Sequence, residues 1–129
     1  MANPLLATPS MAIALQLLVW SVSWMAASIV ALSVCRREGW RAFWLVSGIW
    51  CVVNSAIALA GLMGTPAALP ALRRLLLINA GLDVAYVAVG AILASRPSPR
   101  LRGSGLAVVV QGLFLLIFDT LHAFGLPPA

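Results

Sequence analysis

Two aspartates, Asp83 and Asp119, lie inside apolar stretches of sequence that are long enough to cross a membrane. A carboxylate at the centre of a membrane helix costs about 2.5–3.5 kcal/mol on insertion scales, more than one interhelical hydrogen bond returns. Each aspartate is therefore expected to be protonated, hydrated, or paired with His122 or an arginine, and Arg73 and Arg74 are the nearest arginines. Because such carboxylates often mark ion or proton pathways, both are candidates for a functional role.

Helical spacing places further polar side chains beside these aspartates. Asn79, Asp83 and Tyr86 follow i, i+4, i+7 spacing, and Asp119 lies on the face of its own helix that carries Gln111 and His122. Another apolar stretch, at about 42–64, carries Asn54 on one face, with Trp50 one turn away. The predicted intramembrane polar cluster comprises Asn54, Asn79, Asp83, Tyr86, Gln111, Asp119 and His122.

Several of these residues also have a purely structural interpretation. Asparagine and glutamine in membrane helices often hydrogen-bond a neighbouring helix, at about 0.6 kcal/mol each, and a buried tyrosine packs while its hydroxyl bonds a polar neighbour. Trp20, Trp24 and Trp50 either fill the bundle core or form an aromatic wall around an apolar or cationic ligand. Small residues suit close helix packing, and the glycines expected there are Gly61, Gly64, Gly81, Gly90 and Gly112.

A metal site is the weaker alternative for the acidic residues. Asp119 and His122 form an i, i+3 pair that, together with Asp83, offers three ligands. No CxxC motif or Cys/His cluster accompanies them, and a lone histidine near a helix end is more often an interfacial residue. We therefore expect no metal and no cofactor. The sequence also lacks a phosphate loop, a nucleophile elbow and an HExxH motif, which argues against an enzyme.

The composition indicates that membrane-spanning helices position these polar residues. Of 129 residues, 63% are hydrophobic and only 9% are charged, whereas soluble domains carry about 25% charged residues. Four apolar stretches, at about 11–34, 42–64, 75–94 and 105–124, each approach the ~20 residues that a membrane helix needs. Short connections rich in proline, glycine and arginine separate them. We expect an all-α fold, a four-transmembrane-helix antiparallel bundle in which residues 1–129 form a single membrane domain.

The arginines predict the orientation of this bundle. All eight basic residues are arginines, and the first and third connections carry six of them while the second carries only Arg73 and Arg74. The positive-inside rule then places both termini outside the cytoplasm. In that orientation the aspartates fall in the outer half of the membrane, with Asn54 near its midplane. Arginines clustered beside apolar stretches indicate headgroup contact, so nucleic acid is not an expected partner.

Three spaced motifs resemble those of a known family. The motifs are Asn-x-Gly-Leu-Asp-x-x-Tyr at 79–86, Arg-Gly-Ser-Gly at 102–105 and Gln-Gly-x-Phe-Leu-x-x-x-Asp at 111–119. They are similar to those of a family of uncharacterised small bacterial four-helix integral membrane proteins. The resemblance covers mainly the second half of the chain, with weaker support from Trp50 and Asn54. It implies a multi-pass protein of the bacterial cytoplasmic (inner) membrane, and it implies no activity.

Three functional hypotheses follow. The favoured one is a structural or interaction protein, in which the polar cluster stabilises a bundle that contacts lipid and associates with itself or a larger membrane partner. The alternative is a proton- or cation-coupled transporter or channel subunit that uses Asp83 and Asp119 for an unknown ion or small molecule. The third is a metal- or lipid-handling membrane enzyme. Structural residues should be dry and fully hydrogen-bonded, whereas transport residues need access to solvent or ligand.

Overall fold

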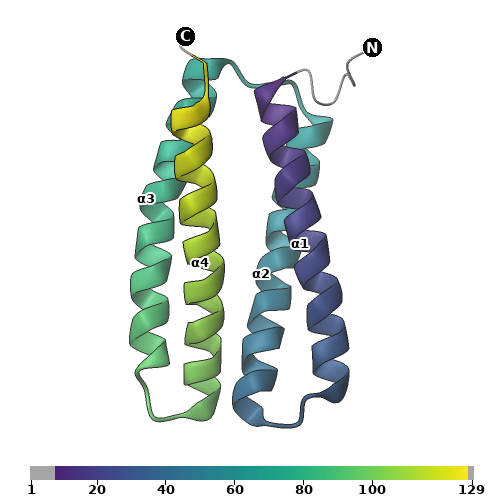
Figure 1. Cartoon of the computed structure of the whole chain (residues 1–129), viewed down its shortest axis with the longest axis vertical. Coiled ribbons are helices and arrows are strands. Elements are labelled where there is room, and N and C mark those ends of the chain that lie inside the picture. The colour runs from purple at the N-terminus through teal and green to yellow at the C-terminus, as the bar shows by residue number, and fades with distance from the viewer. Residues whose placement is uncertain (1–7, 128–129) are drawn as a thin grey trace.

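The computed structural model describes residues 8–127, which form four helices and no strand: α1 (Pro9–Val34), α2 (Glu38–Met63), α3 (Leu69–Ala94) and α4 (Pro99–Gly125) (Figure 1). Each of the four is long and apolar enough to cross a membrane. The predicted all-α four-helix bundle is confirmed.

All four helices begin earlier than the hydrophobic pattern predicted, and three of them by a full turn or more. α2, α3 and α4 start at Glu38, Leu69 and Pro99 rather than near 42, 75 and 105. Prolines occupy the first turns of α3 and α4, where their missing N–H costs nothing. Helices of 26 or 27 residues measure about 39 Å, longer than the ~30 Å hydrocarbon core, so their first turns extend into the headgroup region where arginine is tolerated.

The helices form two antiparallel hairpins, α1 with α2 and α3 with α4, that join through a contact between α2 and α4. The α1–α2 and α3–α4 connections lie at one end of the bundle, and the α2–α3 connection lies at the other (Figure 1). Because α2 and α4 both start at the first of these ends, they run parallel to each other.

Glycines allow the close helix contacts. A Cβ atom on Gly103 would overlap the carbonyl of Gly39, so the first turns of α2 and α4 touch backbone to backbone. A Cβ atom on Gly90 would lie 2.9 Å from the carbonyl oxygen of Gly105, so α3 and α4 are also in close contact. The prediction of a packing role is wrong for Gly81, which has nothing within 4 Å of its Cβ position.

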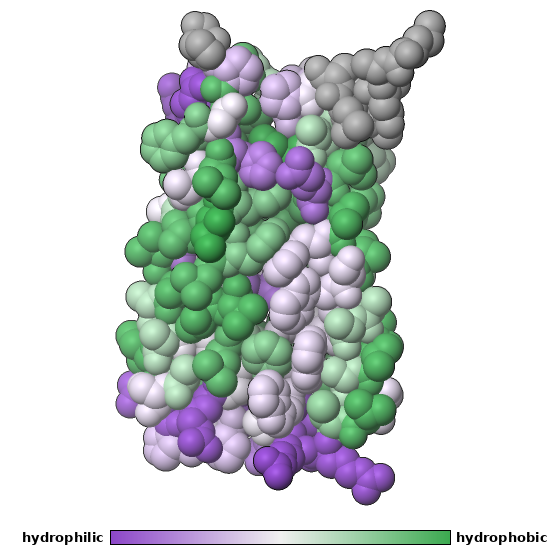
Figure 2. Space-filling view, viewed as in Figure 1, coloured by the Kyte–Doolittle hydropathy of each residue, from purple (hydrophilic) through white to green (hydrophobic). Residues whose placement is uncertain are grey.

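The residues are distributed as a membrane protein requires. Large apolar side chains point outward on every helix, and Ile29, Ile57 and Leu121 are 69%, 59% and 67% exposed. The buried residues are mostly small or polar, which is the pattern of helix packing in lipid. The space-filling view shows a largely hydrophobic body with hydrophilic groups toward both ends, several of them along the lower edge (Figure 2).

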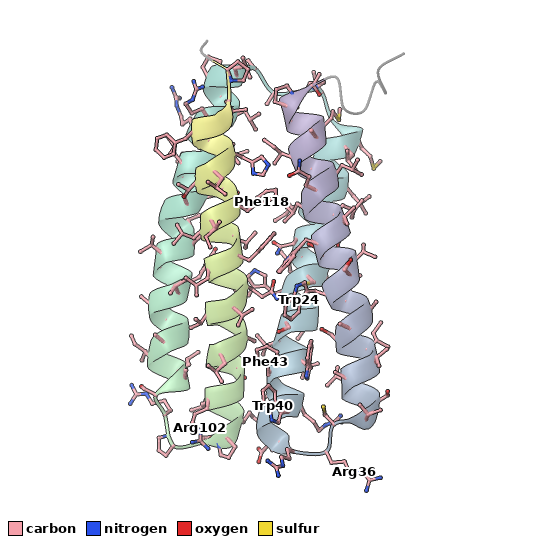
Figure 3. All side chains as sticks on the ribbon, viewed as in Figure 1. Trp24, Arg36, Trp40, Phe43, Arg102 and Phe118 are labelled. Carbon is pink, nitrogen blue, oxygen red and sulfur yellow. The ribbon has the colours of Figure 1, made fainter. Side chains whose placement is uncertain are left out.

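Aromatic side chains fill the space between the two hairpins. Trp20 stacks on Phe114 with ring centroids 3.6 Å apart, and Trp24 lies 5.4 Å from Trp20. In the side-chain view Trp24 and Phe118 also lie between the hairpins (Figure 3). Trp20 therefore holds one hairpin against the other, and Trp24 packs beside it within the bundle.

Candidate functional site

The two intramembrane aspartates face each other across the α3–α4 contact. Asp83 of α3 is 3% exposed and Asp119 of α4 is 7% exposed. The two carboxyl groups are close enough to interact, and both residues line the same cleft. The sequence analysis named His122 or an arginine as the possible partner of each aspartate. In the structure the two aspartates are instead neighbours of each other.

Helix direction explains how residues on different levels meet. The Cα–Cβ bond of a helical residue tilts toward the N-terminus of its helix. α3 and α4 are antiparallel, so the side chains of Asp83 and Asp119 lean in opposite directions along the bundle and converge. Asp83 is 14 residues from Leu69, which is about 21 Å along a helix of about 39 Å. It therefore lies near the middle of α3, because the helix starts earlier than predicted.

A cleft of about 400 Å³ between α2 and α3 leads to this carboxyl pair. Its polar lining consists of Asn54, Asn79, Asp83, Tyr86 and Asp119, so five of the seven residues of the predicted cluster meet here. Apolar side chains form the rest of its wall, and Ile57 and Leu82 at its mouth are 59% and 47% exposed. The mouth therefore opens sideways, toward the lipid surface of the bundle.

Trp50 and Tyr86 meet across this cleft. Trp50 belongs to α2 and Tyr86 to α3, and their rings are 5.1 Å apart and nearly perpendicular. Edge-to-face aromatic pairs contribute about 0.5–1.5 kcal/mol beyond the area they bury. The pair joins two helices that otherwise make little contact, and it bounds the cleft on one side.

Two buried polar atoms of the cleft-lining residues have no hydrogen-bond partner in the described part of the chain: Nδ2 of Asn54 and Oδ2 of Asp83. Leaving a buried polar group unpaired costs about 1–3 kcal/mol. Several buried serine hydroxyls also lack a partner, but a hydroxyl can rotate onto the carbonyl one turn back in its helix. The Asn54 amide and the Asp83 carboxyl therefore each keep a polar atom without a protein partner beside the cleft.

Gln111 belongs to a different contact. Its side chain is fully buried, and its Oε1 accepts hydrogen bonds from Trp20 Nε1 at 3.4 Å and from Cys51 Sγ at 3.8 Å. Gln111 therefore links α4 to α1 and α2, the structural role that its residue type suggested. It does not line the cleft.

His122 also turns away from the aspartates. Its Nε2 lies 2.9 Å from Oε1 of Gln16 on α1, and its Nδ1 lies 2.7 Å from the carbonyl oxygen of Phe118. Within residues 8–127 no group of three or more His, Cys, Asp or Glu side chains is arranged to hold a metal. The three-ligand arrangement considered for Asp83, Asp119 and His122 is therefore not formed.

The expected arginine counter-ion is engaged elsewhere. Arg73 donates hydrogen bonds to the carbonyl oxygens of Ala123, Leu126 and Pro127, at 3.3, 3.2 and 2.8 Å, and so caps the C-terminal end of α4. Over the described residues the only ion pair joins Arg100 to Glu38, 3.4 Å apart and well exposed. The aspartate pair thus has no cationic partner in this part of the protein.

Sequence reasoning missed the apolar half of the site. Leu17, Ile49, Val53, Ile57 and Leu82 all line the cleft, yet each looks like an ordinary lipid-facing residue in the sequence. No residue type or spacing marks them, because their role depends on how α2 and α3 diverge.

A comparison with protein-family models matches residues 16–120 to DUF6992, a family of unknown function. No curated protein and no solved structure matches the chain. The matched range contains every residue that lines the cleft, from Leu17 to Asp119, and it ends before His122. On this match the protein is a member of the DUF6992 family, with four helices suited to crossing a membrane.

Proposed function

We propose that this protein binds an amphipathic cation that enters from the lipid, exchanging it for a proton held by Asp83 and Asp119. One observation carries the proposal: a buried carboxyl pair without a cationic partner lies at the base of a lipid-facing cleft. This favours the proton- or cation-coupled transporter hypothesis over a purely structural role for the two aspartates.

Charge balance supports this proposal. Two carboxylates that share a low-dielectric site cannot both remain ionised without a positive charge beside them. The described residues supply none, so a proton or a cationic ligand must do so. When a monovalent cation binds between the carboxyl groups, the shared proton leaves to water, and the net charge of the site is unchanged.

The cleft walls suggest the class of ligand. A volume of about 400 Å³ falls within the range of ~300–1,000 Å³ that is usual for small-molecule sites. The exposed apolar side chains at the mouth, such as Ile57 and Leu82, favour a hydrophobic body over a bare metal ion. The free Asn54 amide provides a donor for a polar group on the ligand or for a bridging water.

The test uses tetraphenylphosphonium as a lipophilic probe cation and the purified protein in neutral detergent. We expect calorimetric binding with release of about one proton per bound probe, and loss of both signals in Asp83→Asn and Asp119→Asn. Glu38→Gln is the matched control, because it removes the one acid outside the cleft. Unchanged binding in both folded aspartate variants would refute the proposal.

A structural or interaction role remains the second candidate, and the Gln111 contacts favour it. In that case the aspartate pair serves to hold α3 on α4. Asp83→Asn and Asp119→Asn would then lower stability in detergent or change the oligomeric state, while the wild-type protein would bind no cation. A four-helix chain offers few helices for a complete pathway, so we propose that transport would require a homo-oligomer or a larger membrane partner.

We further propose that the protein lies in a bacterial cytoplasmic membrane with both termini outside the cytoplasm. The end that carries the α1–α2 and α3–α4 connections holds six of the eight arginines, Arg36 and Arg102 among them (Figure 3). Cys35, a free and half-buried thiol at this end, reports the orientation, because Cys51 is buried. An impermeant maleimide should label Cys35 only after the membrane of intact cells is opened, and labelling beforehand would reverse the assignment.

A further inference from the structure

A second hollow, of about 430 Å³, lies at the arginine-rich end of the bundle. It lies between the first turns of α2 and α4 and shares no lining residue with the cleft of the aspartate pair. Arg37 and Arg102 line it together with Trp40, Phe43 and Leu106. Nothing in the proposed cation exchange uses these residues.

The positive charge of this hollow has two sources. The Gly39–Gly103 contact holds the N-terminal turns of α2 and α4 side by side, so the partial positive ends of two parallel helices adjoin. The guanidinium groups of Arg37 and Arg102 add two full charges. Glu38 also lines the hollow, but its carboxylate is paired with Arg100.

Arg37 and Arg102 differ from the arginines that the fold itself uses. Arg41 donates to the carbonyl oxygens of Leu32 and Cys35 and so caps α1, and Arg73 and Arg100 are engaged as described above. The guanidinium groups of Arg37 and Arg102 have no hydrogen-bond or ion-pair partner between residues 8 and 127, and both residues are exposed. They therefore remain available to bind an anion.

The lining changes from charged to apolar with depth. Arg102 lies at the end of the bundle, and Trp40 and Phe43 follow toward its centre (Figure 3). Trp40 is 52% exposed and meets Phe43 edge to face at 5.7 Å. Leu106 lies one turn deeper on α4 than Arg102, about 6 Å further into the membrane. A small soluble anion has no apolar part that could contact this wall. A phospholipid has a charged phosphate followed by an apolar acyl chain, which is the same order of charged and apolar groups as in the lining.

We infer that this hollow binds the headgroup of an anionic phospholipid, with the phosphate between Arg37 and Arg102 and the start of an acyl chain against Trp40 and Leu106. Tryptophan prefers the membrane interface, where one side of the ring is apolar and the other is wet. Basic pockets between helix ends are suited to anionic headgroups. The inference is independent of the proposed cation exchange.

The test measures retention of phosphatidylglycerol and phosphatidylcholine on the purified protein by native mass spectrometry. The variant Arg37→Gln/Arg102→Gln is compared with Arg36→Gln/Arg96→Gln, which removes the same charge from the same end, outside this hollow. We expect a preference for phosphatidylglycerol that falls about 25-fold in the first variant, or about fivefold per arginine. In the second variant it should fall by less than about threefold.

Three results would overturn the inference. Equal losses in the two variants would mean that only the general positive field attracts the lipid. Displacement of phosphatidylglycerol by inorganic phosphate at matched concentration would mean that the hollow takes a soluble anion. Equal retention of the two lipids by the wild-type protein would mean that no headgroup site exists. Far-UV circular dichroism establishes that both variants are folded, so each of these readouts is decisive.

Discussion

Substituting alanine for Gly105 should separate α3 from α4. A Cβ atom at Gly105 would lie 2.5 Å from the carbonyl oxygen of Gly90 and 2.8 Å from the carbonyl carbon of Leu93, and it would press on the backbone nitrogen of Ala94. Ordinary contact begins near 3.4 Å. All three neighbours are backbone atoms of α3, which cannot rotate aside as a side chain can. The helices must therefore move apart by about 1 Å, and each buried contact between them weakens.

The magnitude follows from two opposed effects. Overpacking costs about 1–3 kcal/mol, here at the upper end because the obstacle is backbone, while alanine in place of helical glycine returns up to about 1 kcal/mol. Gly105→Ala should thus lower the free energy of unfolding by about 2 kcal/mol. Gly81→Ala is the matched control, since nothing lies within 4 Å of its Cβ position. It should leave stability unchanged or raise it by up to about 1 kcal/mol.

The assay is reversible unfolding of each variant by sodium dodecyl sulfate in mixed micelles, followed by far-UV circular dichroism. The two glycine variants should differ by about 2–3 kcal/mol. If their unfolding free energies agree within about 0.5 kcal/mol, the close backbone contact between α3 and α4 is not present in the protein, and the convergence of the two aspartates loses its basis.

Three further predictions concern polar contacts. Arg73→Gln should destabilise the protein by about 1–2 kcal/mol because the C-terminal carbonyls of α4 lose their cap, whereas Arg74→Gln, which changes an exposed arginine, should have no measurable effect in the same unfolding assay. Gln111→Leu should cost about 1 kcal/mol, since two interhelical hydrogen bonds are lost, and should shift the tryptophan fluorescence because Trp20 loses its acceptor. Glu38→Gln should change stability by less than about 0.5 kcal/mol at moderate salt, because its ion pair is exposed.

The number and type of helices could be read from the sequence because each apolar stretch matches the thickness of a bilayer. The helix starts could not be read in the same way. Residues 38–41, 69–74 and 99–104 are polar or proline-rich, and a hydrophobicity criterion excludes them. Their helical state depends on proline in the first turn and on headgroup contact, which allows arginine to lie on a membrane helix outside the hydrocarbon core.

The polar cluster could be predicted only in part. Asn54, Asn79, Asp83, Tyr86 and Asp119 line one cleft, as shared helix faces and similar depth suggested. Gln111 and His122 do not, because they are displaced from Asp119 by about 80° and 60° around α4. That rotation is small enough to pass as one face in a sequence, yet it turns both side chains from α3 toward α1.

The order of the helices in the bundle was the missing information. A connection of a few residues predicts that consecutive helices pack side by side, but it does not reveal that α2 contacts α4. This contact depends on Gly39 and Gly103, whose packing role is visible only when their backbones are seen together. The cleft between α2 and α3 is a consequence of the same arrangement, so its apolar lining had no signal in the sequence.

The most direct test of the central claim is infrared spectroscopy of the reconstituted protein with and without tetraphenylphosphonium at neutral pH. We predict a carbonyl band from a protonated carboxyl group that disappears when the cation binds, with matching proton release. The band should be absent or shifted in Asp83→Asn and Asp119→Asn, and it should persist in Glu38→Gln. A wild-type protein that binds the cation without any change in this band would show that the aspartate pair is not the binding site.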